Sequence, residues 1–232
     1  MRLIRHSCSF TLLACVAIVL SSAPLGCTAT KTVRDTLTLN DLQIRAGVAE
    51  DKGNWQQAHD LWSDYVERRP QSAMAEYRLG MAKIQLGMYR DAVTHLRIAH
   101  DLRPANVQYI EGLAQALLLA GEQERLLDLL RSTVDEGDGI QGYLRMARYA
   151  RQAGLLDEAH EALELAIVNA GGQSPEPYLA MADFARQTGN TDLEIQNLRY
   201  ALWFDRTNEA IQNRLAELGL IPGPSLAQPP VY

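Results

Sequence analysis

Cysteine, aromatic residues and surplus positive charge are all scarce in this 232-residue chain. Its three cysteines all lie within the first 27 residues, so no disulfide framework can stabilise the rest of the chain. The formal net charge of −6 provides no electrostatic footprint for nucleic acid. Aromatic residues make up 6% of the chain but hydrophobic residues 47%, and the abundance of Ala, Leu, Arg, Glu and Gln favours helix over sheet.

Charged residues are also missing between Arg5 and Lys31. Arg2 and Arg5 precede an apolar run over residues 10–20, and small residues follow it. This layout is typical of a secretory signal peptide, which we expect over residues 1–26. The alternative is a transmembrane helix, but that needs about 20 apolar residues, more than this run supplies unless residues 21–30 join it.

The segment Gly26-Cys27 after the apolar run resembles the lipobox of bacterial lipoproteins. Pro24 holds the position where Leu is usual, and Leu25 stands one place later. Cys15 matches the pattern more closely, but it leaves only a few apolar residues ahead of the cleavage point. The alternative is an ordinary cleavage site beside an unmodified Cys27.

By this resemblance, Cys27 carries lipid and residues 27–38 form a tether to a membrane. Two or more acyl chains anchor a protein stably, whereas a single chain holds it only reversibly. Thr28 after the cysteine implies sorting to an outer membrane, facing the periplasm, in a two-membrane bacterium.

Glycine recurs with a regular period through the rest of the chain. The intervals are 34, 34, 33 and 35 residues between Gly53, Gly87, Gly121, Gly154 and Gly189. Each glycine separates two stretches of about a dozen residues with helical apolar periodicity. The pattern predicts a turn between two paired helices, repeated along the chain.

The second unit carries the clearest set of signature residues, namely Leu79, Gly80, Gly87, Tyr89, Ala92, Leu96, Ala99 and Pro104. They resemble the signature of the tetratricopeptide-repeat (TPR) family. Across residues 39–206 the resemblance implies an all-α solenoid of five helix-turn-helix repeats. Small residues let the paired helices approach closely, and neighbouring pairs share one core. Glu194 departs from the pattern, because it replaces the usual small residue in the fifth repeat.

Two segments follow the repeats. Residues 207–219 begin with an N-cap signal and carry three apolar residues at helical spacing, so we expect a single capping helix. Residues 220–232 contain four prolines, and we expect a flexible or extended tail.

Signatures of catalysis are missing as well. The chain has no Gly-rich phosphate loop and no Gly-x-Ser-x-Gly motif. His160-Glu161 has no second histidine four residues on, which excludes the zinc-protease spacing, and the histidines are expected on the solvated surface. We therefore predict no catalytic residue, no metal and no cofactor, so the chain is not expected to be an enzyme.

In the resembled family the first helix of each pair lines a concave groove. Equivalent positions place Glu111 and Leu144 in one column of that groove. The residues predicted to contact a partner are Tyr77, Met81, Ile84 and Leu118 in an apolar half, and Arg148, Arg151 and Arg186 in a cationic half. An extended acidic segment of a partner could contact both halves, with its acidic groups at the arginines and its apolar part at the apolar half. The alternative is that Arg148 pairs with Asp183 and with Glu neighbours and has no further role.

The expected function is therefore a membrane-anchored scaffold of the cell envelope that binds a protein or peptide partner. Its architecture resembles outer-membrane TPR lipoproteins that assist pilus or secretion assembly. The alternative is a non-catalytic accessory subunit of a cell-wall or exopolysaccharide enzyme complex. Architecture alone does not separate the two, because one fold serves many functions.

Overall fold

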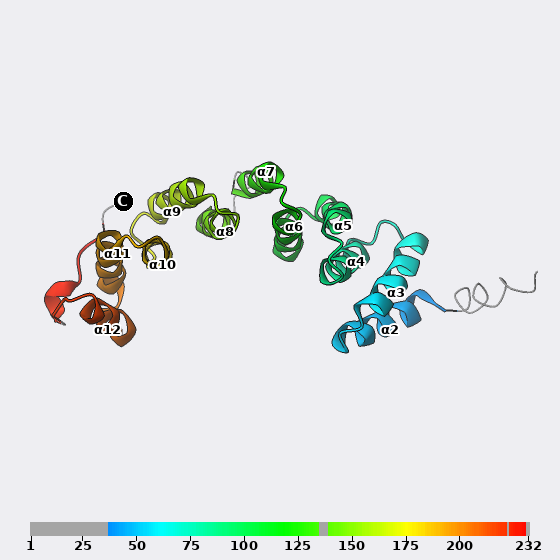
Figure 1. Ribbon diagram of the computed structural model, residues 1–232, viewed down its shortest axis with the longest axis horizontal. Helices are drawn as coiled ribbons and strands as arrows, with labels where there is room; N and C mark the ends of the chain where they lie inside the picture. The colour runs from blue at the N-terminus through cyan, green and yellow to red at the C-terminus, as the bar shows by residue number, and fades with distance from the viewer. Residues whose placement is uncertain (1–36, 135–138, 222, 231–232) are drawn as a thin grey trace, which may run out of the picture. The chain divides into compact units, whose positions relative to one another are not determined.

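The computed structural model describes residues 37–134, 139–221 and 223–230 (Figure 1). Over these residues it contains helices and no strand. The α-helices are α2 (Leu39–Asp51), α3 (Trp55–Arg68), α4 (Ala73–Gln85), α5 (Tyr89–Leu102), α6 (Val107–Ala120), α7 (Gln123–Thr133), α8 (Gly139–Gln152), α9 (Leu156–Ala170), α10 (Glu176–Thr188), α11 (Thr191–Phe204) and α12 (Glu209–Glu217). None of these helices is long and apolar enough to cross a bilayer. The predicted signal peptide and Cys27 lie outside the described residues.

The helices form five consecutive pairs, from α2–α3 to α10–α11, and α12 packs against α11. This confirms the predicted all-α repeat architecture with a capping helix. The glycine at each turn has a positive φ, as at Gly121 (73°) and Gly189 (77°), where it follows the last residue of the first helix. A residue without a Cβ adopts this left-handed conformation readily, which explains the glycine period.

Small residues bring paired helices together. A Cβ added to Gly80 on α4 would lie 2.5 Å from Leu96 Cγ on α5, and Ala92 and Ala99 on α5 are fully buried. The first helices α4, α6, α8 and α10 also contact one another in series. One continuous core cluster consequently contains buried side chains from α4 through α10.

Proline stops two of the second helices. α3 ends at Arg68 and α5 ends at Leu102, each two residues before a proline. The residue between, Arg69 or Arg103, leaves the helical region with φ near −145° (−143° and −148°). The ring of the following proline disfavours helical backbone at this position, so the chain turns toward the next repeat.

The capping helix is held by the residue that breaks the repeat pattern. Glu194 on α11 is buried, and its carboxylate accepts from Arg214 Nε at 2.7 Å and from Nη2 at 3.2 Å. Arg214 lies on α12, which begins after the N-cap Asn208. A small residue at position 194 could not make this contact, so the departure from the repeat pattern serves to attach α12.

Residues 220–232 were predicted to be flexible or extended, and residues 223–230 are docked on the last repeat. A short 3₁₀ turn, η2 (Pro224–Leu226), brings the chain back onto α11 (Figure 1). Leu226 is buried among side chains of α10, α11 and α12, and its carbonyl accepts from Arg199 Nε at 2.9 Å. The Gln228 N–H donates to the Arg199 carbonyl at 3.1 Å. Proline content indicated extended backbone, but it could not show that one apolar side chain finds a site at the end of the core.

Candidate functional site

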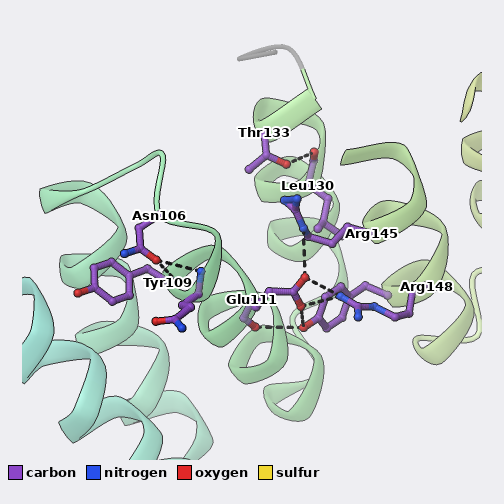
Figure 2. Close-up of polar contacts among 9 residues, drawn as sticks. Asn106, Tyr109, Glu111, Leu130, Thr133, Arg145 and Arg148 are labelled. Atoms are coloured by element: carbon purple, nitrogen blue, oxygen red, sulfur yellow. Dashed lines mark hydrogen bonds and ion pairs between the residues drawn. The ribbon is translucent and has the colours of Figure 1, made fainter. Parts of the chain in front are cut away.

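A cleft of about 430 Å³ lies between α6 and α8, the first helices of the third and fourth repeats. Its lining residues, which define the α6–α8 cleft, are Val107, Glu111, Gln141, Leu144, Arg145 and Arg148. Figure 2 shows Arg145 and Arg148 extending from α8 toward Glu111 on α6. The cleft combines apolar side chains with a small set of convergent polar groups, which is the usual composition of a binding site.

The start of α6 is held in place by a side-chain cap. Asn106 accepts from the backbone N–H groups of Gln108 at 2.9 Å and Tyr109 at 3.3 Å (Figure 2). Such a cap satisfies N–H groups that the first helical turn leaves unpaired. Glu111 follows in the next turn, so the cap helps to set the position of its carboxylate.

Glu111 is the centre of the polar cluster. Arg148 Nη2 lies 2.6 Å from each carboxylate oxygen, and Arg145 Nε donates to Oε1 at 3.2 Å. The Tyr149 hydroxyl lies 2.7 Å from Oε2 and 3.1 Å from the Glu111 carbonyl, and it can donate to either. These charge-assisted bonds tie α8 to α6.

The two arginines differ in exposure. Arg145 is buried beside Glu111, whereas 47% of the Arg148 side chain is exposed. The Arg148 guanidinium carbon also lies 5.0 Å from the centre of the Tyr149 ring, within the range of a cation–π contact. Arg148 is therefore oriented by two neighbours while it still faces solvent.

The protonation states in the cluster follow from its contacts. Burial by itself raises the pKa of Glu111, but hydrogen bonds from Tyr149 and Arg148 and the charges of both arginines outweigh it, so the pKa lies below its usual value. Burial, followed by the hydrogen bond to Glu111, raises the pKa of Tyr149. At neutral pH the cluster therefore contains a carboxylate, two guanidinium groups and a neutral phenol.

A second carboxylate is bound by a lining residue of the cleft. Gln141 Nε2 donates to Glu176 Oε2 of α10 at 2.8 Å. The nearby charges are thus two guanidinium groups and two carboxylates, and the Arg148 side chain is more exposed (47%) than that of Glu111 (33%).

The other predicted contact residues are not in this cleft. Ile84 is only 5% exposed and belongs to the core cluster, so its assignment to an open groove was wrong. Tyr77, Met81 and Leu118 pack against the same cluster and are partly buried. Tyr77 also lies 5.0 Å from the ring of Tyr109, and burial is the main cause that raises its pKa.

The three predicted arginines have different partners. Arg148 pairs with Glu111, as the alternative expectation of a glutamate neighbour had it, whereas Asp183 pairs with another arginine. Arg186 pairs with Asp183 on its own helix, and Arg151 donates to Gln187 of α10. Only Arg148 reaches the α6–α8 cleft.

Sequence reasoning missed Arg145, Tyr149 and Val107 as site residues. It had aligned Glu111 and Leu144 in one column, and both line the cleft. The sequence did contain a signal for this cluster. Glu111 in the third repeat aligns with Leu144 in the fourth, and Leu144 stands next to Arg145.

The histidine prediction was also incomplete. His95 is largely buried, and its Nδ1 lies 2.7 Å from the buried carboxylate of Glu76. Among the residues that the structure describes, no group of His, Cys, Asp and Glu side chains could hold a metal ion.

Solved structures with the same fold include two of MamA and one of PilW. Residues 41 to the end of MamA from Desulfovibrio magneticus RS-1 are 14% identical, with 74% of this chain and 97% of that chain covered and a TM-score of 0.53. A second MamA structure is 17% identical, with coverages of 79% and 96% and a TM-score of 0.55. PilW, described as a widely conserved type IV pilus biogenesis factor, is 16% identical, with coverages of 80% and 89% and a TM-score of 0.51.

These structures are TPR proteins, and the chain has the TPR fold. No protein-family model matches the sequence. No curated protein sequence matches it either. At these identities the likeness concerns the fold, and the function must be argued from the surface of this chain.

Proposed function

We propose that this chain is a protein-interaction scaffold that binds a segment of a partner protein in the α6–α8 cleft. The observation that carries the proposal is Arg148, which is half exposed, is held by two neighbours and lines a cleft of about 430 Å³. A binding site at this position would bridge two consecutive repeats.

The orientation of Arg148 favours recognition of a carboxylate. A free arginine side chain loses rotamer entropy when it binds, whereas Glu111 and Tyr149 already restrict this one. The contacts to Glu111 use Nη2, and a guanidinium group has five N–H donors. The partner segment would therefore place an acidic group against the remaining donors of Arg148.

Apolar contacts would come from the sides of the cleft. Val107 is 49% exposed at the start of α6, and Leu144 lines the cleft from α8. Removing such surfaces from water contributes about 25 cal/mol per Å² buried. The proposed partner segment thus combines an acidic group with at least one aliphatic side chain.

A photoreactive amino acid at Val107 would test the cleft directly. We expect it to crosslink a specific envelope protein, and we expect Arg148→Glu to abolish that crosslink. The matched controls are a photoreactive residue at exposed Glu124 on α7, which should not capture the same protein, and Arg186→Glu, which should leave the crosslink intact. Capture that persists in the Arg148→Glu chain would contradict the proposal.

Membrane attachment through Cys27 is a separate part of the proposal and is supported by the sequence alone. Cys27→Ala should move the chain from the membrane to the soluble fraction, whereas Cys15→Ala should not. Retention of the Cys27→Ala chain in membranes would show that another feature anchors it, and release by Cys15→Ala alone would identify the earlier cysteine.

A place in pilus or secretion assembly is the narrower form of the proposal. Its support is the fold likeness to PilW and the expected envelope location. The protein crosslinked at position 107 should then be a component of such an assembly. Recovery of a cell-wall or polysaccharide enzyme would instead favour the accessory-subunit hypothesis.

A further inference from the structure

A second hollow lies on different helices from the cleft. A groove of about 370 Å³ separates α9 from α11, the second helices of the fourth and fifth repeats, and residues of α10 also line it. It shares no lining residue with the α6–α8 cleft. We call it the α9–α11 groove.

The floor of the groove is apolar. Tyr178 and Met181 of α10 are almost completely buried beneath it, and Ile167 and Leu193 add partly buried apolar surface. At its edge Val168 is 63% exposed, the highest value among the apolar residues of the repeat helices. Exposed apolar surface next to a hollow of this kind often marks a site where a partner excludes water.

The rim of the groove on α9 is acidic. Asp157, Glu161, Glu164 and Val168 are all exposed, and their spacing of four, three and four residues places them on one face of the helix. α9 contains no lysine or arginine, and His160 lies 3.8 Å from Glu164. An acidic row therefore leads along α9 to an exposed apolar side chain at the groove.

The rim on α11 adds no available positive charge. Gln196 Nε2 donates to the Tyr200 hydroxyl at 2.9 Å, and both residues line the groove. Arg199 is the one basic residue of α11, and it donates to the carbonyl of Leu226 in the C-terminal segment. Charge complementarity thus favours a basic partner for the α9–α11 groove, whereas the partner proposed for the α6–α8 cleft is acidic.

We propose that the α9–α11 groove binds a basic amphipathic helix of a partner protein. One apolar side chain of that helix would enter the groove beside Val168, and its lysine or arginine side chains would face the acidic row. The row from Asp157 to Val168 spans about 16 Å at 1.5 Å per residue, which corresponds to about three helical turns of the partner. Helix-in-groove binding of this type uses side chains repeated every three or four residues.

The test uses the full chain and a fluorescent 14-residue peptide of leucine and lysine arranged as an amphipathic helix. Fluorescence anisotropy at about 0.15 M salt should show binding, and a matched peptide with glutamate in place of lysine should not bind. The double substitution Glu161→Lys with Glu164→Lys should weaken binding about tenfold or more, because it reverses the acidic row. Failure of the lysine peptide to bind the wild-type chain would overturn the proposal.

Two control variants separate the groove from general attraction between opposite charges. Glu124→Lys with Asp128→Lys makes the same net charge change on exposed positions of α7, and it should weaken binding less than about threefold. Equal loss in the two double variants would overturn the proposal. Val168→Ser should weaken binding about threefold to tenfold, and no effect would remove the apolar part of the site.

Location is checked with a photoreactive residue at one leucine of the peptide. Crosslinks to α9 and α11 support the groove, and crosslinks confined to other helices overturn it. Arg148→Glu should leave peptide binding unchanged or slightly stronger, so failure of the cleft proposal and failure of this one remain distinguishable. Each variant is accepted only if its helical circular dichroism and Tm match those of the wild-type chain.

Discussion

The α6–α8 cleft and the α9–α11 groove are built from the same repeat but differ in how their charges are satisfied. In the cleft, Glu111 receives donors from Arg145, Arg148 and Tyr149, so the polar groups hold two repeats together. Along the groove, Glu161 and Glu164 are exposed above an apolar floor. Polar side chains between first helices can thus serve structure and recognition together, whereas those on the outside of a second helix are available for recognition alone.

The largest expected effect lies beneath the groove. Tyr178 is fully buried in the cluster that joins α10, α11 and α12. Tyr178→Ala should therefore lower the free energy of unfolding by about 3–5 kcal/mol, measured by urea denaturation. Tyr178→Phe keeps the ring and should cost less than about 1.5 kcal/mol. A small loss for the alanine variant would show that the floor of the groove is not part of the core.

The ion pair of Glu194 provides a comparison with the ion pair of Glu111 in the cleft. Substitution of Glu194 tests whether any ion pair between helices marks a binding site. Its pair with Arg214 attaches the capping helix, and neither residue lines the cleft or the groove. Glu194→Ala should cost about 2 kcal/mol in unfolding free energy without changing crosslinking at Val107 or peptide binding at the groove. The control is Glu217→Ala, which removes an exposed partner of the same arginine and should cost less than about 0.5 kcal/mol. Comparable losses in the two variants would contradict a special role for the buried carboxylate.

The docked C-terminal segment gives an effect of similar or smaller size. Leu226→Ala should lower the unfolding free energy by about 2 kcal/mol, the low end for buried leucine, because a terminal segment can shift to fill the space. Limited proteolysis should then cleave the segment earlier than in the wild-type chain. Exposed Ile221, changed to Ala, is the matched control and should alter neither measurement. Unchanged proteolysis of the Leu226→Ala chain would show that this side chain does not hold the segment.

Acid should affect the cleft through Glu111. Because its pKa is lower in the folded chain, the contribution of Glu111 to stability is present above the ordinary glutamate pKa. That contribution declines as the pH falls below about 4.3 and through the lower folded value. Denaturation midpoints across this range should therefore fall less steeply for Glu111→Gln than for the wild-type chain. Identical slopes would mean that the contacts of Glu111 do not stabilise its charge.

The smallest effect is expected at Arg186. Its pair with Asp183 is exposed on one helix, and such pairs contribute little. Arg186→Ala should change the unfolding free energy by no more than about 0.5 kcal/mol and should leave crosslinking at Val107 unchanged. A marked loss of the crosslink would return Arg186 to the binding site and would weaken the distinction between the cleft and the other predicted arginine positions.

Local sequence was sufficient to predict the repeat fold, since the features that specify it are close together in the chain. The glycine at each turn needs a positive φ, and small residues such as Gly80 are needed where paired helices touch. Both requirements recur with the period of the repeat. The place of Leu96 in the core follows in the same way, from apolar spacing on one helix.

Contacts between repeats decided the rest. Ile84 and Arg148 both occupy first helices, yet stacking buries one and leaves the other half exposed. Glu111 meets Arg148 across 37 residues, and Leu226 reaches Arg199 across 27. The sequence by itself determined the helices and their pairing, because their signals are local. Only the tertiary structure determined which side chains face a cleft, because burial depends on how neighbouring repeats pack.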